Sequence, residues 1–137
     1  NSMRKLAFVC LAALLIGACT TTPQSKSRVF FIEPKDDANV GQEFKVVMGV
    51  EGMTVKPLGD MSPNTGHHHL LINAENVPNG EIVPVDKPTQ YMHFGKGHTE
   101  TMVKLAPGKY KQTLQFADGA HRSYGESMRS TLSVTVK

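Results

Sequence analysis

Three consecutive histidines, His67, His68 and His69, are the residues of this chain with the clearest capacity for chemistry. They run directly into the apolar residues 70–72, and this pattern predicts that the triplet begins a β-strand. Successive side chains of a strand point to opposite faces of the sheet, so His67 and His69 would share one face and His68 would lie on the other. Two neighbouring imidazoles on one face can serve as the first ligands of a metal ion.

Two further histidines, His93 and His98, lie close together later in the chain. The run Tyr-Met-His-Phe at 91–94 predicts a short strand. If that strand neighbours the strand of the triplet, His93 would approach His67 and His69, and three imidazoles would converge. The turn Gly-Lys-Gly at 95–97 presents His98 at the strand end. The candidate metal ligands are therefore His67, His69, His93 and His98.

The first 27 residues predict export and attachment to lipid. A basic pair at 4–5 precedes an apolar run over 6–16, and Ile-Gly-Ala-Cys at 16–19 resembles the bacterial lipoprotein signal closely. An apolar run of this length is too short to span a membrane as a helix. We expect a signal peptide over 1–18, lipidation of Cys19, a flexible tether over 19–27 and a folded domain over 28–137. By resemblance to enteric sorting rules, Thr20 favours the outer membrane, with the domain facing the periplasm.

The positions of the cysteines restrict the metals that the domain could bind. The chain has two cysteines, Cys10 in the expected signal peptide and Cys19 at the expected lipid site. The mature domain would then hold no thiolate ligand, which excludes thiolate zinc sites, iron–sulfur clusters and copper centres with a cysteine ligand. Imidazoles, with the thioethers of Met53 and Met61 as further candidates, favour copper, and zinc is the second choice.

Charge and motifs exclude several other functions. The net charge of +3 comes from 15 Lys and Arg against 12 Asp and Glu. Without Arg4 and Lys5 the balance is 13 against 12, and no basic run suited to nucleic acid occurs. The sequence has no Gly-x-Ser-x-Gly, P-loop or His-Glu-x-x-His motif, so we expect a protein that is not an enzyme. Asp60 and Glu100 flank the histidine segments and could accept hydrogen bonds from imidazole N–H groups.

The expected mature domain consists of short apolar or alternating segments separated by turn residues. In one of them Tyr110, Gln112, Leu114 and Phe116 recur with a period of two. No stretch shows a helical period with caps. The pattern predicts an all-β fold, a single antiparallel immunoglobulin-like β-sandwich of about seven strands. The expected strands are 28–33, 44–50, 67–73, 90–94, 99–105, 110–116 and 130–136.

Three stretches of the chain together resemble a family of short exported bacterial proteins classed as a domain of unknown function. They read Val-Phe-Phe-Ile-Glu-Pro-Lys-Asp at 29–36, Gly-His-His-His-Leu-Leu-Ile at 66–72 and His-Phe-Gly-Lys-Gly-His-Thr-Glu at 93–100. The resemblance spans nearly all of residues 28–137. It implies a compact exported β domain and supplies no activity.

A second resemblance concerns residues 107–121, which are similar to the closing hairpin of the copper-resistance C proteins. Those proteins are periplasmic immunoglobulin-like sandwiches that bind copper through histidines. Their turn reads Asp-Gly-His, whereas here Ala120 stands before His121. Their N-terminal ligand histidine has no counterpart, since Cys19 takes the expected mature terminus. The resemblance therefore supports the sandwich and does not carry His121 over as a copper ligand.

Two functions of different classes are consistent with these observations. The first is a lipid-anchored, non-enzymatic metal-binding protein, for storage, delivery or resistance, most readily for copper. The second is a structural or interaction module of an envelope complex, in which the histidines hydrogen-bond to loop groups and order the long loops. An envelope enzyme or a sugar-binding module ranks third.

Overall fold

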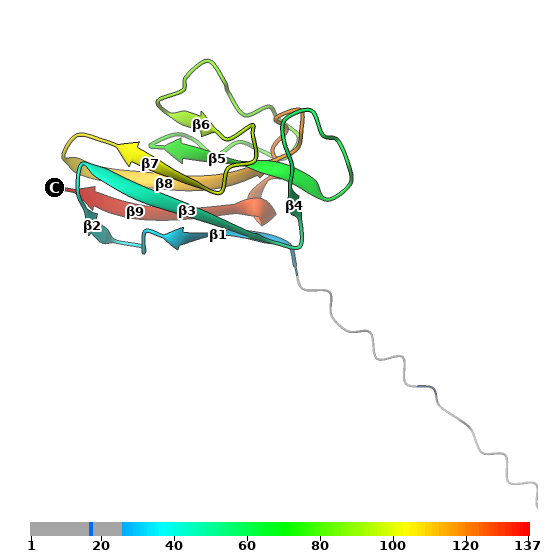
Figure 1. The fold of residues 1–137 in the computed structure, drawn as a ribbon, viewed down its shortest axis with the longest axis horizontal. Helices are drawn as coiled ribbons and strands as arrows, with labels where there is room; N and C mark the ends of the chain where they lie inside the picture. Colours follow the sequence, from blue (N-terminus) through cyan, green and yellow to red (C-terminus); the bar gives the residue numbers. More distant parts are fainter. Residues whose placement is uncertain (1–16, 18–25) are drawn as a thin grey trace, which may run out of the picture.

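The computed structural model describes residue 17 and residues 26–137, so the expected signal peptide and Cys19 lie outside the described residues. The described part is all-β, with no α-helix and one short 3-10 turn, η1 (Glu126–Met128) (Figure 1). No helix in it is long and apolar enough to cross a membrane. Its strands are β1 (Arg28–Glu33), β2 (Ala38–Val40), β3 (Glu43–Glu51), β4 (Thr54–Val55), β5 (Thr65–Ile72), β6 (Tyr91–His93), β7 (Glu100–Lys104), β8 (Gly108–Ala117) and β9 (Arg129–Val136).

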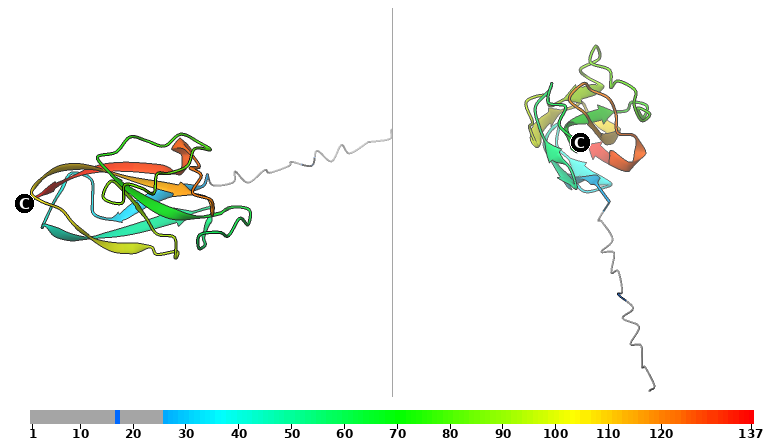
Figure 2. Two further views of the ribbon diagram at one scale, coloured as in Figure 1. Left: turned by 90° about the horizontal axis from the view of Figure 1, so that it is seen from above. Right: turned by 90° about the vertical axis from the view of Figure 1, so that its right-hand side faces the viewer.

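The strands form two sheets that face each other as two curled layers (Figure 2). The smaller sheet has the order β1-β3-β7. The larger sheet has the order β2-β9-β8-β5-β4, and β6 pairs with residues 69–71 of β5. The two sheets and the all-β class agree with the expectation from sequence.

Strand number and direction differ from that expectation. The described part has nine strands rather than about seven, because β2 and β4 are only three and two residues long. Such short strands carry no readable alternation. Both pair in parallel, β2 with β9 and β4 with β5. The larger sheet is therefore mixed, and the prediction of a purely antiparallel arrangement is wrong at these two pairs.

The main hydrophobic core lies between the two sheets. It brings Val46 and Met48 of β3 together with Leu114 and Phe116 of β8, all at 2% exposure or less. Tyr110, Leu114 and Phe116 of β8 all contact this core, as the predicted period of two requires, and the opposite face of residues 112–117 is buried as well. Burying a side chain of this kind stabilises the fold by about 1.5–3 kcal/mol. The core holds β8 in place, and β5, the strand that carries the histidine triplet, pairs antiparallel with β8.

A second apolar cluster covers the outer face of the larger sheet. Leu71 of β5 and Ala117 of β8 contact Ala74, Val77 and Val83 of the connection between β5 and β6. This connection packs back against the sheet through these apolar residues. The second cluster thereby encloses the face of β5 opposite the main core.

Candidate metal centre

Strand β5 is buried along its whole length, and its side chains alternate between the two apolar clusters. Leu70 and Ile72 belong to the main core, whereas Leu71 belongs to the outer cluster. His68 shares the core face and meets Phe116 edge to face, with ring centroids 5.2 Å apart. His67 and His69 occupy the outer face, as strand alternation predicts.

Three imidazoles converge on that outer face. The ring centroid of His67 lies 4.7 Å from that of His69 and 5.0 Å from that of His121, and His69 and His121 are 5.4 Å apart. One ring nitrogen from each histidine lies within 4.8 Å of the others. Two imidazole nitrogens on one zinc ion are about 3.3 Å apart, given metal–nitrogen bonds of about 2.0–2.1 Å in a tetrahedron. The Nε2 of His67 and the Nδ1 of His121 already have that separation, at 3.3 Å.

His93 borders this group. Strand β6 pairs antiparallel with β5 and places His93 directly opposite His69, so the expected neighbourhood of the two histidine strands is confirmed. The His93 ring centroid is 5.2 Å from that of His121, 6.1 Å from His69 and 6.5 Å from His67. The side chain is exposed, and the close group of ligand atoms does not include it. His93 is therefore a neighbour of the three converging imidazoles, at their solvent side.

The close group differs from the expected ligand set in three residues, because His93 and His98 lie outside it and His121 belongs to it. His98 lies outside the close group and lines a surface pocket that it shares with His93. His121, which the sequence did not assign to the site, takes its place. The Asp-Gly-Ala-His turn was visible in the sequence, but nothing in the sequence shows which strand end it faces. The Nε2 of His67 and the Nδ1 of His121 are 3.3 Å apart, within hydrogen-bond distance.

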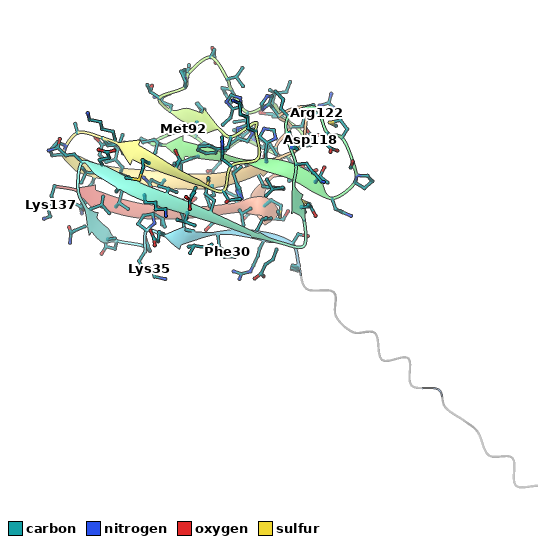
Figure 3. The ribbon with its side chains drawn as sticks, viewed as in Figure 1. Phe30, Lys35, Met92, Asp118, Arg122 and Lys137 are labelled. Atoms are coloured by element: carbon teal, nitrogen blue, oxygen red, sulfur yellow. The ribbon has the colours of Figure 1, made fainter. Side chains whose placement is uncertain are left out.

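The turn after β8 holds His121 by its backbone. The Asp118 carboxylate accepts hydrogen bonds from the N–H groups of Ala120 at 2.8 Å and Arg122 at 2.9 Å. His121 adopts the left-handed conformation with φ 63°, which is uncommon for residues other than glycine. Its carbonyl accepts a hydrogen bond from the N–H of Val83 at 2.8 Å. Figure 3 shows Asp118 and Arg122 at the end of the domain opposite Lys137.

The loop before β5 closes over the same turn. A Cβ added to Gly119 would lie 2.3 Å from the carbonyl oxygen of Asp60, so only glycine fits this approach. Gly59 donates a hydrogen bond to the Gly119 carbonyl at 3.0 Å, and Leu58 donates one to the Gly95 carbonyl at 2.8 Å. One loop therefore links the turn that carries His121 to the turn that follows His93.

Strand β8 is the neighbour of β5 along the histidine triplet. Ala117 pairs with His67 and Gln115 with His69. The Gln115 amide is already committed, because its Nε2 donates to the carbonyl of Gly125 at 3.0 Å and its Oε1 accepts from Arg129 at 2.9 Å. It therefore offers nothing to the neighbouring His69 ring.

Burial dominates the electrostatics of these rings. Burial first, and the neighbouring imidazoles second, together lower the pKa of His67 to about 4 and that of His69 to about 2. Burial also lowers the pKa of His68 to about 4. The pKa of His121 is lowered by burial and by His93, against the charge of Asp118, which raises it. At neutral pH His67 and His69 are uncharged, which is the form of imidazole that binds metal.

The hydrogen-bond partners of the ring nitrogens show whether the histidines order the neighbouring loops. Within the described residues, Nδ1 of His67 and both nitrogens of His69 are buried and have no hydrogen-bond partner. Loop-ordering histidines would donate to loop carbonyls, as most buried polar groups do. His68 also lacks partners, so missing hydrogen bonds alone do not identify a ligand. What sets His67 and His69 apart is their convergence with a third imidazole.

The other anticipated contacts of the site are not formed. Asp60 accepts hydrogen bonds from the N–H and the hydroxyl of Ser62, and Glu100 pairs with Lys45 at 3.4 Å. Both expectations of a hydrogen bond to imidazole are therefore wrong. Met53 packs against the main core, and the side chain of Met61 is 57% exposed. The carboxylate whose charge affects the histidines is that of Asp118. It partly opposes the lowering of the pKa of His67 and His121.

A two-sheet β domain with a buried histidine cluster on its outer face is the class that fold and site define. The chain belongs to the family described as Domain of unknown function (DUF4399), which matches residues 46–137. The matched range begins within β3 and contains all the histidines of the site. The expected membership in a family of unknown function is thus confirmed. No curated protein and no solved structure matches the chain significantly, so the similarity to copper-resistance C proteins finds no support there.

Proposed function

We propose that this protein is a lipid-anchored metal-binding protein of the bacterial cell envelope. It would store the ion, deliver it or confer resistance to it, without catalysing a reaction. The observation that carries the proposal is the convergence of His67, His69 and His121, whose ligand atoms lie within 4.8 Å of one another. Two of the three rings are fully buried and, at neutral pH, uncharged. Neutral imidazoles in that arrangement can bind a transition-metal ion without first losing a proton.

Copper is the ion that we propose first. Imidazole sites bind Cu(II) more tightly than the other divalent first-row metals, and zinc follows as the alternative suited to three nitrogen ligands. The thioethers lend copper no support, since Met61 is exposed and Met53 packs into the core. The proposal of copper therefore rests on the imidazoles alone.

The cellular location is part of the same proposal. The lipoprotein-like signal ending at Cys19 supports a lipid anchor in the outer membrane and a domain facing the periplasm. The two facing sheets with a common core support an immunoglobulin-like sandwich with two short parallel strands at its margins.

The direct test is titration of the purified protein with Cu(II) and, separately, with Zn(II). We expect one ion per chain with a dissociation constant below about 1 µM, or about −8 kcal/mol. The variant His67→Ala/His69→Ala should weaken binding by more than about 100-fold, the upper range for loss of mere supporting partners of a ligand. Binding that is equally tight in this variant would contradict the proposal.

A second pair of variants compares the two ligand sets. His121→Ala removes an imidazole of the close group, whereas His98→Ala removes one outside it. The proposal requires a larger loss of affinity in His121→Ala than in His98→Ala. A larger loss in His98→Ala would instead support the ligand set expected from the sequence, which contains His98 and not His121.

An interaction module remains the second candidate because of exposed apolar residues near the site. Ile82 is 61% and Val85 55% exposed on the connection that covers the outer face of the larger sheet. Large exposed apolar side chains near one another are typical of surfaces that contact a partner. Absence of metal binding in the titration above, together with loss of a copurifying envelope partner in Ile82→Ser/Val85→Ser, would favour this function.

A further inference from the structure

A surface pocket adjoins the histidine cluster. Its volume is about 440 Å³, within the range of sites that hold small ligands. His93 belongs to the pocket and also borders the cluster, with its ring 5.2 Å from that of His121. The pocket is lined by Leu58, His93, Phe94, Gly95, Lys96 and His98.

Backbone contacts border part of the cluster, whereas His121 itself is only half-buried. On one side Gly119 lies against Asp60, and on another the carbonyl of His121 bonds to Val83. His67 and His69 have no exposed surface. Of the imidazoles that border them, His121 is half-buried and His93 is exposed and lines the pocket, so an ion that reaches the buried rings from the pocket passes His93.

Backbone hydrogen bonds hold the wall of the pocket in place. Its turn is held by hydrogen bonds from Leu58 to the Gly95 carbonyl at 2.8 Å and from Gly97 to the Phe94 carbonyl at 2.9 Å. Gly97 has φ 84°, the left-handed region that favours glycine. Since the walls are fixed in advance, a ligand would not have to order them.

We propose that this pocket is the exchange port of the metal centre, where a small anionic chelator binds and receives or supplies the ion through His93 and His98. This inference rests on the proposed function. Lys96 supplies the positive charge that attracts a carboxylate, and Leu58 and Phe94 supply apolar walls. The step is a ligand exchange: a carboxylate or amine of the chelator bonds to the ion as an imidazole nitrogen leaves it, and the oxidation state of the ion is unchanged.

The port is tested by the rate of transfer rather than by affinity. Protein loaded with one equivalent of Cu(II) is mixed with excess ethylenediaminetetraacetate, and the loss of the protein-bound ion is followed by stopped-flow absorbance. Leu58→Trp fills the pocket and His98→Ala removes a transfer ligand. We expect each to slow transfer by about tenfold, which corresponds to about 1.4 kcal/mol in the barrier, and by more than it changes the equilibrium affinity.

A matched control uses the same substitution elsewhere. Ile32→Trp also introduces tryptophan at a half-exposed position, since Ile32 is 47% and Leu58 49% exposed, and it should leave the transfer rate unchanged. The same chelating group attached to a large dextran, which cannot enter the pocket, should remove the ion more slowly from wild-type protein.

The outcomes separate the two proposals. If wild-type protein binds no ion, the proposed function fails and the port fails with it. If the ion binds but Leu58→Trp and His98→Ala both transfer it at the wild-type rate, the port alone is overturned. Dextran-bound chelator that acts as fast as free chelator would also overturn it.

Discussion

Both ring nitrogens of His69 are buried without a hydrogen-bond partner among the described residues. Leaving a buried polar group unpaired costs about 1–3 kcal/mol. A metal ion bonded to one nitrogen would offset part of that cost for His69 and also for His67. His68 gains no such compensation and has only the ring contact with Phe116. The unpaired ring nitrogens of His67 and His69 thus destabilise the metal-free protein, and a bound ion would stabilise it.

The lowered pKa values predict how the metal-free protein responds to acid. In the folded state the pKa of His68 is about 4 and that of His69 about 2, against 6.5 as the usual value. Below pH 6.5 the unfolded chain therefore binds more protons than the folded chain, and the free energy of unfolding falls as the pH falls. Each such histidine contributes a slope of at most about 1.4 kcal/mol per pH unit.

Urea unfolding at pH 7 and pH 5 in the presence of a chelator measures this slope. We expect a clearly lower free energy of unfolding at pH 5. The variant His68→Phe, which lacks one of the buried histidines, should show a smaller slope. Equal stability of the wild-type protein at the two pH values would show that the histidines are not buried as described.

The sequence predicts which histidines share a face within one strand, but it does not predict contacts between histidines far apart in the chain. Alternation along one strand was enough to separate His67 and His69 from His68, because it is a local property of the backbone. His121 lies 54 positions after His67, and its approach depends on how the turn after β8 bends. No period or spacing in the sequence carries that information.

At the scale of elements, the site depends on the turn that follows β8. Gly119→Ala would place a Cβ 2.3 Å from the backbone oxygen of Asp60, and neither backbone can yield without moving the turn. We expect a loss of about 1–3 kcal/mol in the free energy of unfolding, typical of overpacking. Metal affinity should fall as well, because His121 moves with the turn.

Gly41→Ala is the matched control, since its added Cβ would have 3.8 Å to the nearest atom. Urea unfolding and Cu(II) titration of both variants measure the difference. A Gly119→Ala protein as stable and as tightly binding as Gly41→Ala would contradict the close packing of this turn against the loop before β5.

Element prediction succeeded where strands are long and alternate. The run of period two in β8 was readable because its inward side chains meet a continuous core. Strands β2 and β4 were missed, because two or three residues paired in parallel at a sheet margin leave no pattern. The expectation that β6 neighbours β5 is borne out by the pairing of His69 with His93.

At the scale of the whole molecule, the fold separates stability from the site. The main core lies between the sheets, and the histidine cluster lies on the outer face of the larger sheet, the face that also carries the second apolar cluster. The end that bears Asp118 and Arg122 is opposite the end that bears Lys137 (Figure 3). The pattern of short alternating segments between turns predicted two facing sheets. The outer covering was not predicted, because it depends on a long connection folding back over one particular strand.

The central claim is that His67, His69 and His121 bind one metal ion together. Nuclear magnetic resonance of the protein with ¹⁵N-labelled histidine, recorded during titration with diamagnetic Zn(II), observes each imidazole nitrogen directly. The account predicts that one ring nitrogen of each of these three histidines shifts to the metal-bound range at one equivalent, while those of His68 and His98 do not. Unshifted nitrogens in the three, or shifts confined to the exposed histidines, would contradict it.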